Sequence, residues 1–120
     1  MHPPKTVLIV EPSADEREVL RTVLERRGLR IFEADGADEG LQLARDEHPD
    51  VIVLDMDARS PEDGSELSAA FDQASGEPTN VIVLGTVRAN ARLPADQVIA
   101  KPYHFGPLVR KIEELAAKAA

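Results

Sequence analysis

Runs of mainly apolar residues recur along the chain, most clearly at residues 6–10, 51–54 and 81–84. Such runs, rich in β-branched side chains, are typical of strands that are buried on both faces in a parallel sheet covered by helices. Segments 29–34 and 97–100 are weaker, and the mixed polarity of the first favours a strand at a sheet edge. The pattern therefore predicts five strands.

The segments between these runs carry apolar residues at helical spacing. The predicted helices cover residues 14–27, 37–47, 65–74 and 105–119. The first begins with a capping-box pattern, Ser13 followed three residues later by Glu16, and ends before Gly28. Residues 88–94 are few and polar and end in proline, so at most one or two helical turns fit there. The alternation of strand and helix predicts a parallel five-stranded sheet with helices on both faces.

Composition narrows the class of protein. A chain of 120 residues with 42% hydrophobic content predicts one globular domain over residues 1–120. The absence of cysteine excludes a disulfide scaffold and a zinc-thiolate site, and it fits a reducing, cytoplasmic compartment. No apolar stretch is long enough to predict a membrane span. The net charge of -8 argues against direct binding to nucleic acid, because phosphates would be repelled.

Polar residues follow the ends of the predicted strands and should meet at one edge of the sheet. They are Glu11, Asp55, Asp57, Gly85, Thr86 and Lys101. Crowded carboxylates need a cation, and both Mg²⁺ and a lysine ammonium suit them. An aspartate between a metal ion and a lysine is prepared to attack phosphorus, since both cations stabilise charge on the transferring phosphoryl oxygens. A simple lysine–aspartate ion pair that closes the sheet edge is the alternative, and it needs neither metal nor phosphate.

Two motifs make the chain resemble a known family over its entire length. These are Pro-Asp-Val-Ile-Val-Leu-Asp at residues 49–55 and Lys-Pro-Tyr at residues 101–103. They resemble the receiver domains of bacterial two-component response regulators. The resemblance implies a flavodoxin-like fold with strand order 2-1-3-4-5. It also implies a cis peptide bond before Pro102 that would aim Lys101 at Asp55.

The resemblance also implies roles for the residues at the sheet edge. Asp55 would be the phospho-acceptor, and Lys101 would contact the carboxylate and the phosphate. The chain would then be a regulatory phospho-acceptor domain rather than an enzyme. Its partner would be a histidine kinase or another signalling protein, and a dimer would be possible.

The metal site departs from the family pattern. The family has two consecutive acids after its first strand, and this chain has Glu11 followed by Pro12. Proline has no side-chain oxygen to offer a metal ion. Glu11, Asp55 and Asp57 would then form a weak Mg²⁺ site, or the ion would be absent.

This chain also differs from the family pattern at the positions that respond to phosphate. Gly85 stands where the family has a threonine or serine, and Thr86, one place later, is the remaining hydroxyl candidate. Val98 stands where the family has its aromatic switch residue. The fourth helix of the family would be short or missing. A switch needs an element whose equilibrium the phosphate biases, and several parts of that element are altered.

Two functions remain open. The sequence favours a divergent pseudo-receiver that acts as a protein–protein interaction module, because the switch is altered in three places. The alternative is a working phospho-receiver that accepts a phosphoryl group on Asp55 from a histidine kinase with Mg²⁺, supported by Glu11 and Lys101. A flavin carrier on the same fold fits less well, because residues 11–13 lack a phosphate-binding loop.

Overall fold

The computed structural model describes residues 3–55, 64–76, 80–85 and 93–119. These residues contain five strands, four α-helices and one 3₁₀ turn. In chain order they are β1 (Thr6–Val10), α1 (Ala14–Arg26), β2 (Arg30–Ala34), α2 (Ala37–Glu47), β3 (Val51–Asp55), α3 (Gly64–Ser75), β4 (Asn80–Gly85), the 3₁₀ turn (Ala95–Gln97), β5 (Val98–Ala100) and α4 (Phe105–Lys118).

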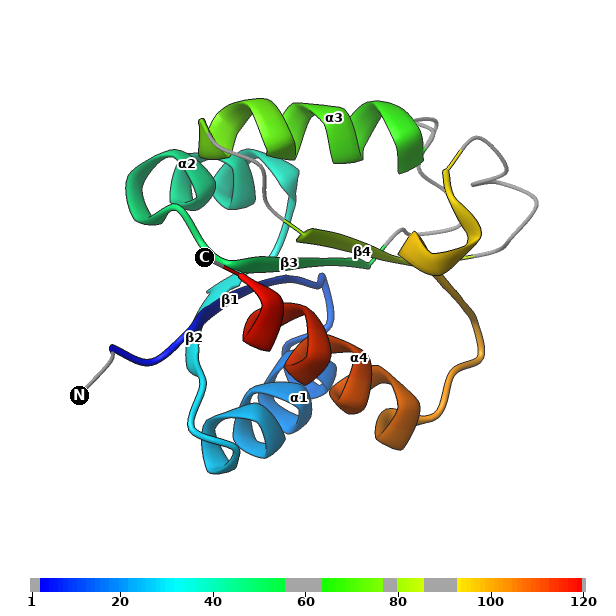
Figure 1. Cartoon of the computed structure of the whole chain (residues 1–120). Coiled ribbons are helices and arrows are strands. Elements are labelled where there is room, and N and C mark those ends of the chain that lie inside the picture. The colour runs from blue at the N-terminus through cyan, green and yellow to red at the C-terminus, as the bar shows by residue number, and fades with distance from the viewer. Residues whose placement is uncertain (1–2, 56–63, 77–79, 86–92, 120) are drawn as a thin grey trace.

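The five strands form one parallel sheet in the order β2-β1-β3-β4-β5. This confirms the predicted fold class, the predicted strand order and the edge position of β2. Helices α2 and α3 cover one face of the sheet, and α1 and α4 cover the other (Figure 1). Because β3 lies in the middle of the sheet, its carboxyl end is flanked by the ends of β1 and β4.

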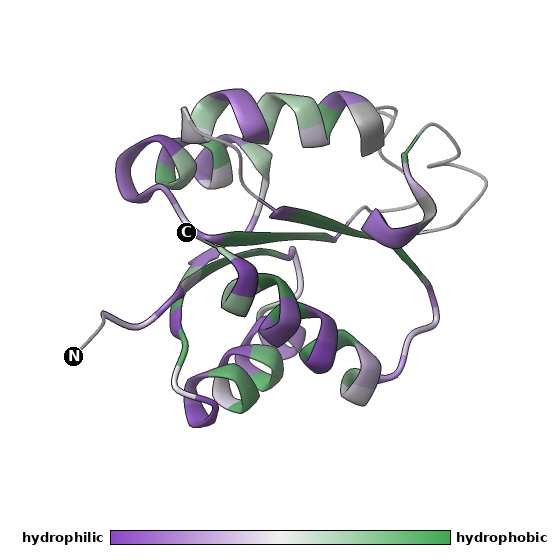
Figure 2. Cartoon of the chain, in the orientation of Figure 1, coloured by the Kyte–Doolittle hydropathy of each residue, from purple (hydrophilic) through white to green (hydrophobic). Residues whose placement is uncertain are grey.

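Alternate residues of each strand are buried on opposite faces of the sheet. On β1, Val7 and Ile9 pack with α1 and α4, while Leu8 and Val10 pack with α2 and α3. All four side chains are at most 5% exposed. Figure 2 shows the central strands as the most hydrophobic part of the ribbon, with mixed helices around them. Burial on both faces explains why these strands are continuous apolar runs in the sequence.

Gly40 lets α2 approach the sheet closely. A Cβ atom at this position would lie 2.8 Å from Val10 Cγ2 and 3.0 Å from Phe71 Cζ. Phe71, on α3, is fully buried. The glycine therefore makes room for the largest side chain of the core between α2, α3 and β1.

Helix and strand ends agree with the sequence predictions to within about one residue. The main difference lies at β5, where Gln97 belongs to the 3₁₀ turn and the strand begins at Val98. The short helix predicted between β4 and β5, at residues 88–94, falls mostly on residues 86–92, which lie outside the described residues. No helix in the described part of the chain is long and apolar enough to cross a membrane.

The amino end of β1 and the carboxyl end of α4 are joined by a hydrogen bond. Lys5 Nζ donates to the backbone carbonyl of Ala119 at 2.7 Å. Both groups lie at the edge of the sheet where the parallel strands begin. The opposite edge, where the strands end, carries the predicted site.

Candidate functional site

Asp55 and Lys101 meet at the carboxyl edge of the sheet. Asp55 is the last residue of β3, and Lys101 directly follows β5. The Lys101 ammonium forms an ion pair with Asp55 Oδ1. The peptide bond between Lys101 and Pro102 is cis. The contact that the sequence predicted between this lysine and this aspartate is therefore present.

The second oxygen of Asp55 has no hydrogen-bond partner among the residues that the structure describes. The Asp55 side chain is only 3% exposed. Its Oδ2 atom is buried and accepts no hydrogen bond within the described part of the chain. A buried carboxylate oxygen without a donor is costly, and a cation or a proton would relieve that cost.

Glu11 lies beside Asp55 at the end of β1. The Glu11 side chain is buried, and its Oε1 accepts a hydrogen bond from the backbone N–H of Ser13 at 2.9 Å. Burial raises the pKa of Glu11 to about 8, and the neighbouring Asp55 carboxylate adds to the increase. Two adjacent buried carboxylates repel each other in the charged form. A divalent cation between them would remove this repulsion.

Glu16 is a third carboxylate at this edge, and the sequence analysis missed its part in the site. One carboxylate oxygen from each of Glu11, Glu16 and Asp55 lies within 4.8 Å of the others. The sequence assigned Glu16 to a capping box with Ser13. Only half of that box forms, because Ser13 Oγ accepts from the Glu16 N–H at 3.3 Å while the Ser13 N–H donates to Glu11.

The carboxylate cluster suits the ion that the family resemblance implies. Magnesium prefers carboxylate and water oxygens, and the cluster offers only carboxylates. Asp55 Oδ2, for which the described residues offer no donor, points to the same requirement. The residues present therefore fit Mg²⁺. Asp57, the other predicted ligand, lies outside the described residues.

The sequence analysis assigned Gly85, Thr86 and Val98 to positions that respond to phosphate in the family. Gly85 ends β4 and its backbone carbonyl accepts from the Lys101 N–H at 3.1 Å. It has no hydroxyl to offer a phosphoryl group. Thr86, the alternative hydroxyl, lies outside the described residues. Val98, at the position of the switch aromatic, is half-buried at the start of β5.

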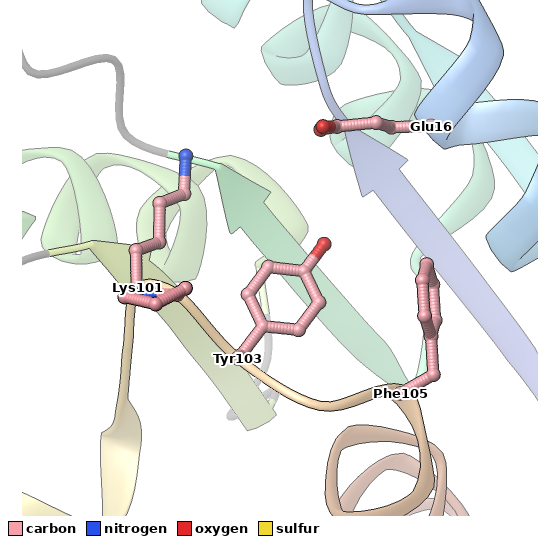
Figure 3. A pocket seen from close by; sticks show the side chains of 5 residues that line it. Glu16, Lys101, Tyr103 and Phe105 are labelled. Carbon is pink, nitrogen blue, oxygen red and sulfur yellow. The ribbon is translucent and has the colours of Figure 1, made fainter.

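An open pocket of about 480 Å³ adjoins the carboxylates. It is lined by Glu16, Lys101, Pro102, Tyr103 and Phe105 (Figure 3). The Tyr103 and Phe105 rings pack edge to face, with centroids 5.8 Å apart. Burial raises the pKa of Tyr103 to about 12, and the charges of Glu16, Asp55 and Glu11 contribute. The Phe105 side chain is 39% exposed.

A doubly wound parallel sheet with a buried aspartate at the end of its central strand defines a class of α/β domains that carry their chemistry at the carboxyl edge. The model of the response regulator receiver domain matches residues 7–113, and the chain belongs to this family of two-component signalling domains.

Two relatives of similar sequence are named as transcriptional regulatory proteins. The chain is 36% identical over 110 residues to the KDP operon transcriptional regulatory protein KdpE of Escherichia coli, covering 88% of this chain and 48% of that protein. It is 26% identical over 118 residues to the transcriptional regulatory protein ResD of Bacillus subtilis, covering 95% of this chain and 49% of that protein. The chain thus spans about half the length of these relatives.

Solved structures support the same fold. A response regulator from Thermotoga maritima superposes with a TM-score of 0.76 at 20% identity, covering 96% of this chain and 99% of that chain. The structure titled FixJ-N superposes with a TM-score of 0.74 at 24% identity, covering 100% of this chain and 98% of that chain.

Proposed function

We propose that this receiver domain is a working phospho-acceptor, with Asp55 as the nucleophile. The observation that carries this proposal is the state of the Asp55 carboxylate. One oxygen is paired with Lys101, and the other is buried beside further carboxylates without a hydrogen-bond partner in the described part of the chain. A plain structural ion pair would leave no reason to bury an unsatisfied oxygen. The sequence alone favoured the pseudo-receiver, and the acidic surroundings of Asp55 reverse that preference.

The proposed transfer uses the groups at the sheet edge. An oxygen of Asp55 attacks phosphorus and forms a P–O bond, while the bond from phosphorus to its donor breaks and the donor keeps that electron pair. With a histidine kinase the donor would be a phosphorylated imidazole. Lys101 holds the carboxylate in place and offers positive charge to the phosphoryl oxygens. Mg²⁺, held by Glu11 and Asp55, would supply further positive charge to those oxygens.

A second candidate function is the pseudo-receiver that binds a partner without phosphate. It is favoured by Gly85, which has no hydroxyl, and by Val98, which has no aromatic ring. In either case the proposed partners are a histidine kinase or another signalling protein in the cytoplasm. The exposed Phe105 side chain beside the pocket offers an apolar contact to such a partner.

Phosphorylation with acetyl phosphate distinguishes the two functions. Wild-type protein, incubated with acetyl phosphate and Mg²⁺, should gain one phosphoryl group by intact mass, while Asp55→Asn should gain none. Asp35→Asn is the matched control, because Asp35 is exposed and follows β2 at the same edge of the sheet. It should be phosphorylated like wild type. Unmodified wild-type protein under these conditions would favour the pseudo-receiver.

A further inference from the structure

The Glu16 carboxylate does not make the capping-box hydrogen bond that its sequence position predicts. In a complete capping box it would accept the N–H of Ser13, but Glu11 accepts that hydrogen bond. Within the described part of the chain, the Glu16 side chain has no hydrogen-bond or ion-pair partner. Figure 3 shows it extending from α1 across the pocket, with the Tyr103 hydroxyl directed toward it.

Among the described residues, one ammonium group lies against the carboxylate cluster. Glu11, Glu16 and Asp55 bring three carboxylates together, and Lys101 brings one ammonium. Arg17 of α1 donates to the backbone carbonyl of Glu11 at 2.5 Å, and its Nε lies 3.7 Å from Glu33 Oε1. With all three carboxylates ionised, the described groups leave a net charge that one divalent cation would balance.

A second, independent observation points into the same space. The Asp55 side chain is only 3% exposed. Its Oδ2 atom has no hydrogen-bond partner among the described residues. The cluster of carboxylates is therefore more than a group of exposed acids. One of its members carries a buried acceptor atom for which the described residues supply no hydrogen-bond donor.

We propose that Glu16 is a metal ligand, supplying from the first turn of α1 the second carboxylate that Pro12 does not provide. The inference rests on the proposed Mg²⁺-dependent role of Asp55. In this proposal the second carboxylate ligand comes from the helix that follows the β1 loop and not from the loop itself. The longer glutamate side chain spans the extra distance, and the partial capping box leaves it available.

Metal binding can be measured without phosphorylation. Mn²⁺ serves as the probe, since it shares the oxygen preference of Mg²⁺ and its free aqueous form is quantified by electron paramagnetic resonance. Mg²⁺ is then added as competitor. We expect Glu16→Gln to weaken Mn²⁺ binding at least about tenfold, since even outer-shell partners of a metal cost that much.

Two further variants make the test specific. Glu18→Gln removes the same charge from an exposed position of the same helix, and it should bind Mn²⁺ like wild type. Adding Pro12→Asp to Glu16→Gln restores an acid at the family position, and it should recover the affinity. Thermal unfolding by circular dichroism checks that each variant folds.

The outcomes separate this inference from the proposed function. Equal affinity of Glu16→Gln and wild type would overturn the role of Glu16 and leave phosphorylation of Asp55 intact. Weakened binding together with an unphosphorylated wild type would support Glu16 as a ligand and overturn the phospho-acceptor role. Absence of saturable Mn²⁺ binding in wild type would overturn both.

Discussion

Tyr103 is the sole tyrosine of the chain, and the chain has no tryptophan. Its ring is half-buried against the core, and its hydroxyl is directed toward the Glu16 carboxylate (Figure 3). Both features disfavour the ionised phenolate, because burial removes water and the carboxylates repel negative charge. A single residue therefore reports on the electrostatic state of the whole cluster.

We predict that the phenol of Tyr103 titrates with a raised pKa. Its absorbance should change with a midpoint near pH 12, because the pKa of Tyr103 is raised to about 12 from the ordinary 10.0. Glu16→Gln should lower this pKa by removing one repelling charge, while burial keeps it above its ordinary value. Circular dichroism in the same samples verifies that the protein is still folded. An ordinary pKa in folded wild-type protein would contradict the described position of the hydroxyl.

Individual site residues differ in how far sequence could predict them. Asp55 and Lys101 could be predicted, because each directly follows a strand and parallel strands end at one edge. Glu16 could not, because a serine followed three residues later by a glutamate predicts a complete capping box. The competition from Glu11 for the Ser13 N–H depends on how the loop after β1 turns. That choice of partner depends on the three-dimensional path of the loop and not on the local sequence pattern.

At the scale of elements, the close contact between α2 and the sheet depends on one glycine. Helix interiors normally disfavour glycine, so a buried Gly40 indicates a steric requirement. That requirement comes from Val10 on β1 and Phe71 on α3, which touch the position where a side chain would begin. The packing of α2, α3 and β1 therefore leaves no space for a methyl group at residue 40.

We predict that Gly40→Ala destabilises the fold. Overpacking a core typically costs about 1–3 kcal/mol, which outweighs the roughly 1 kcal/mol that alanine gains in helix propensity. Gly106→Ala is the matched control, because a Cβ at this position in α4 meets no atom within 4 Å. Its stability should be unchanged or slightly higher. Urea unfolding measures both variants, and equal stability of Gly40→Ala and wild type would contradict the tight packing.

The strands that could be predicted best from the sequence are those in which nearly every residue is buried. The runs at β1, β3 and β4 are buried on both faces, so their composition alone indicates strands. β5 is harder to delimit because its three residues are only partly buried or exposed, and the preceding 3₁₀ turn includes Gln97. Its limits depend on tertiary contacts with β4.

At the scale of the whole molecule, the buried acid at the site couples the stability of the fold to pH. The pKa of Glu11 rises from 4.5 to about 8 on folding. The folded state therefore retains a proton that the unfolded state releases over this interval. The resulting contribution to stability is complete below pH 4.5 and is lost as the pH rises through about 8.

We predict that the free energy of unfolding of metal-free protein falls between pH 5 and pH 8 more steeply for wild type than for Glu11→Gln. Glutamine keeps a carbonyl oxygen for the Ser13 N–H but cannot titrate. Comparing the two proteins cancels the other titrating groups, which both share. Urea unfolding in a chelating buffer at several pH values gives the difference. Parallel curves would contradict a raised pKa for Glu11.

The hydrogen bond between Lys5 and Ala119 brings both ends of the described chain to the side where the strands begin. Asp55 lies at the opposite side. A tag or surface anchor joined at either end would therefore leave the acidic site facing the solution. Protein immobilised through either end should give the same response to ions and phosphoryl donors, so the attachment can be chosen for convenience.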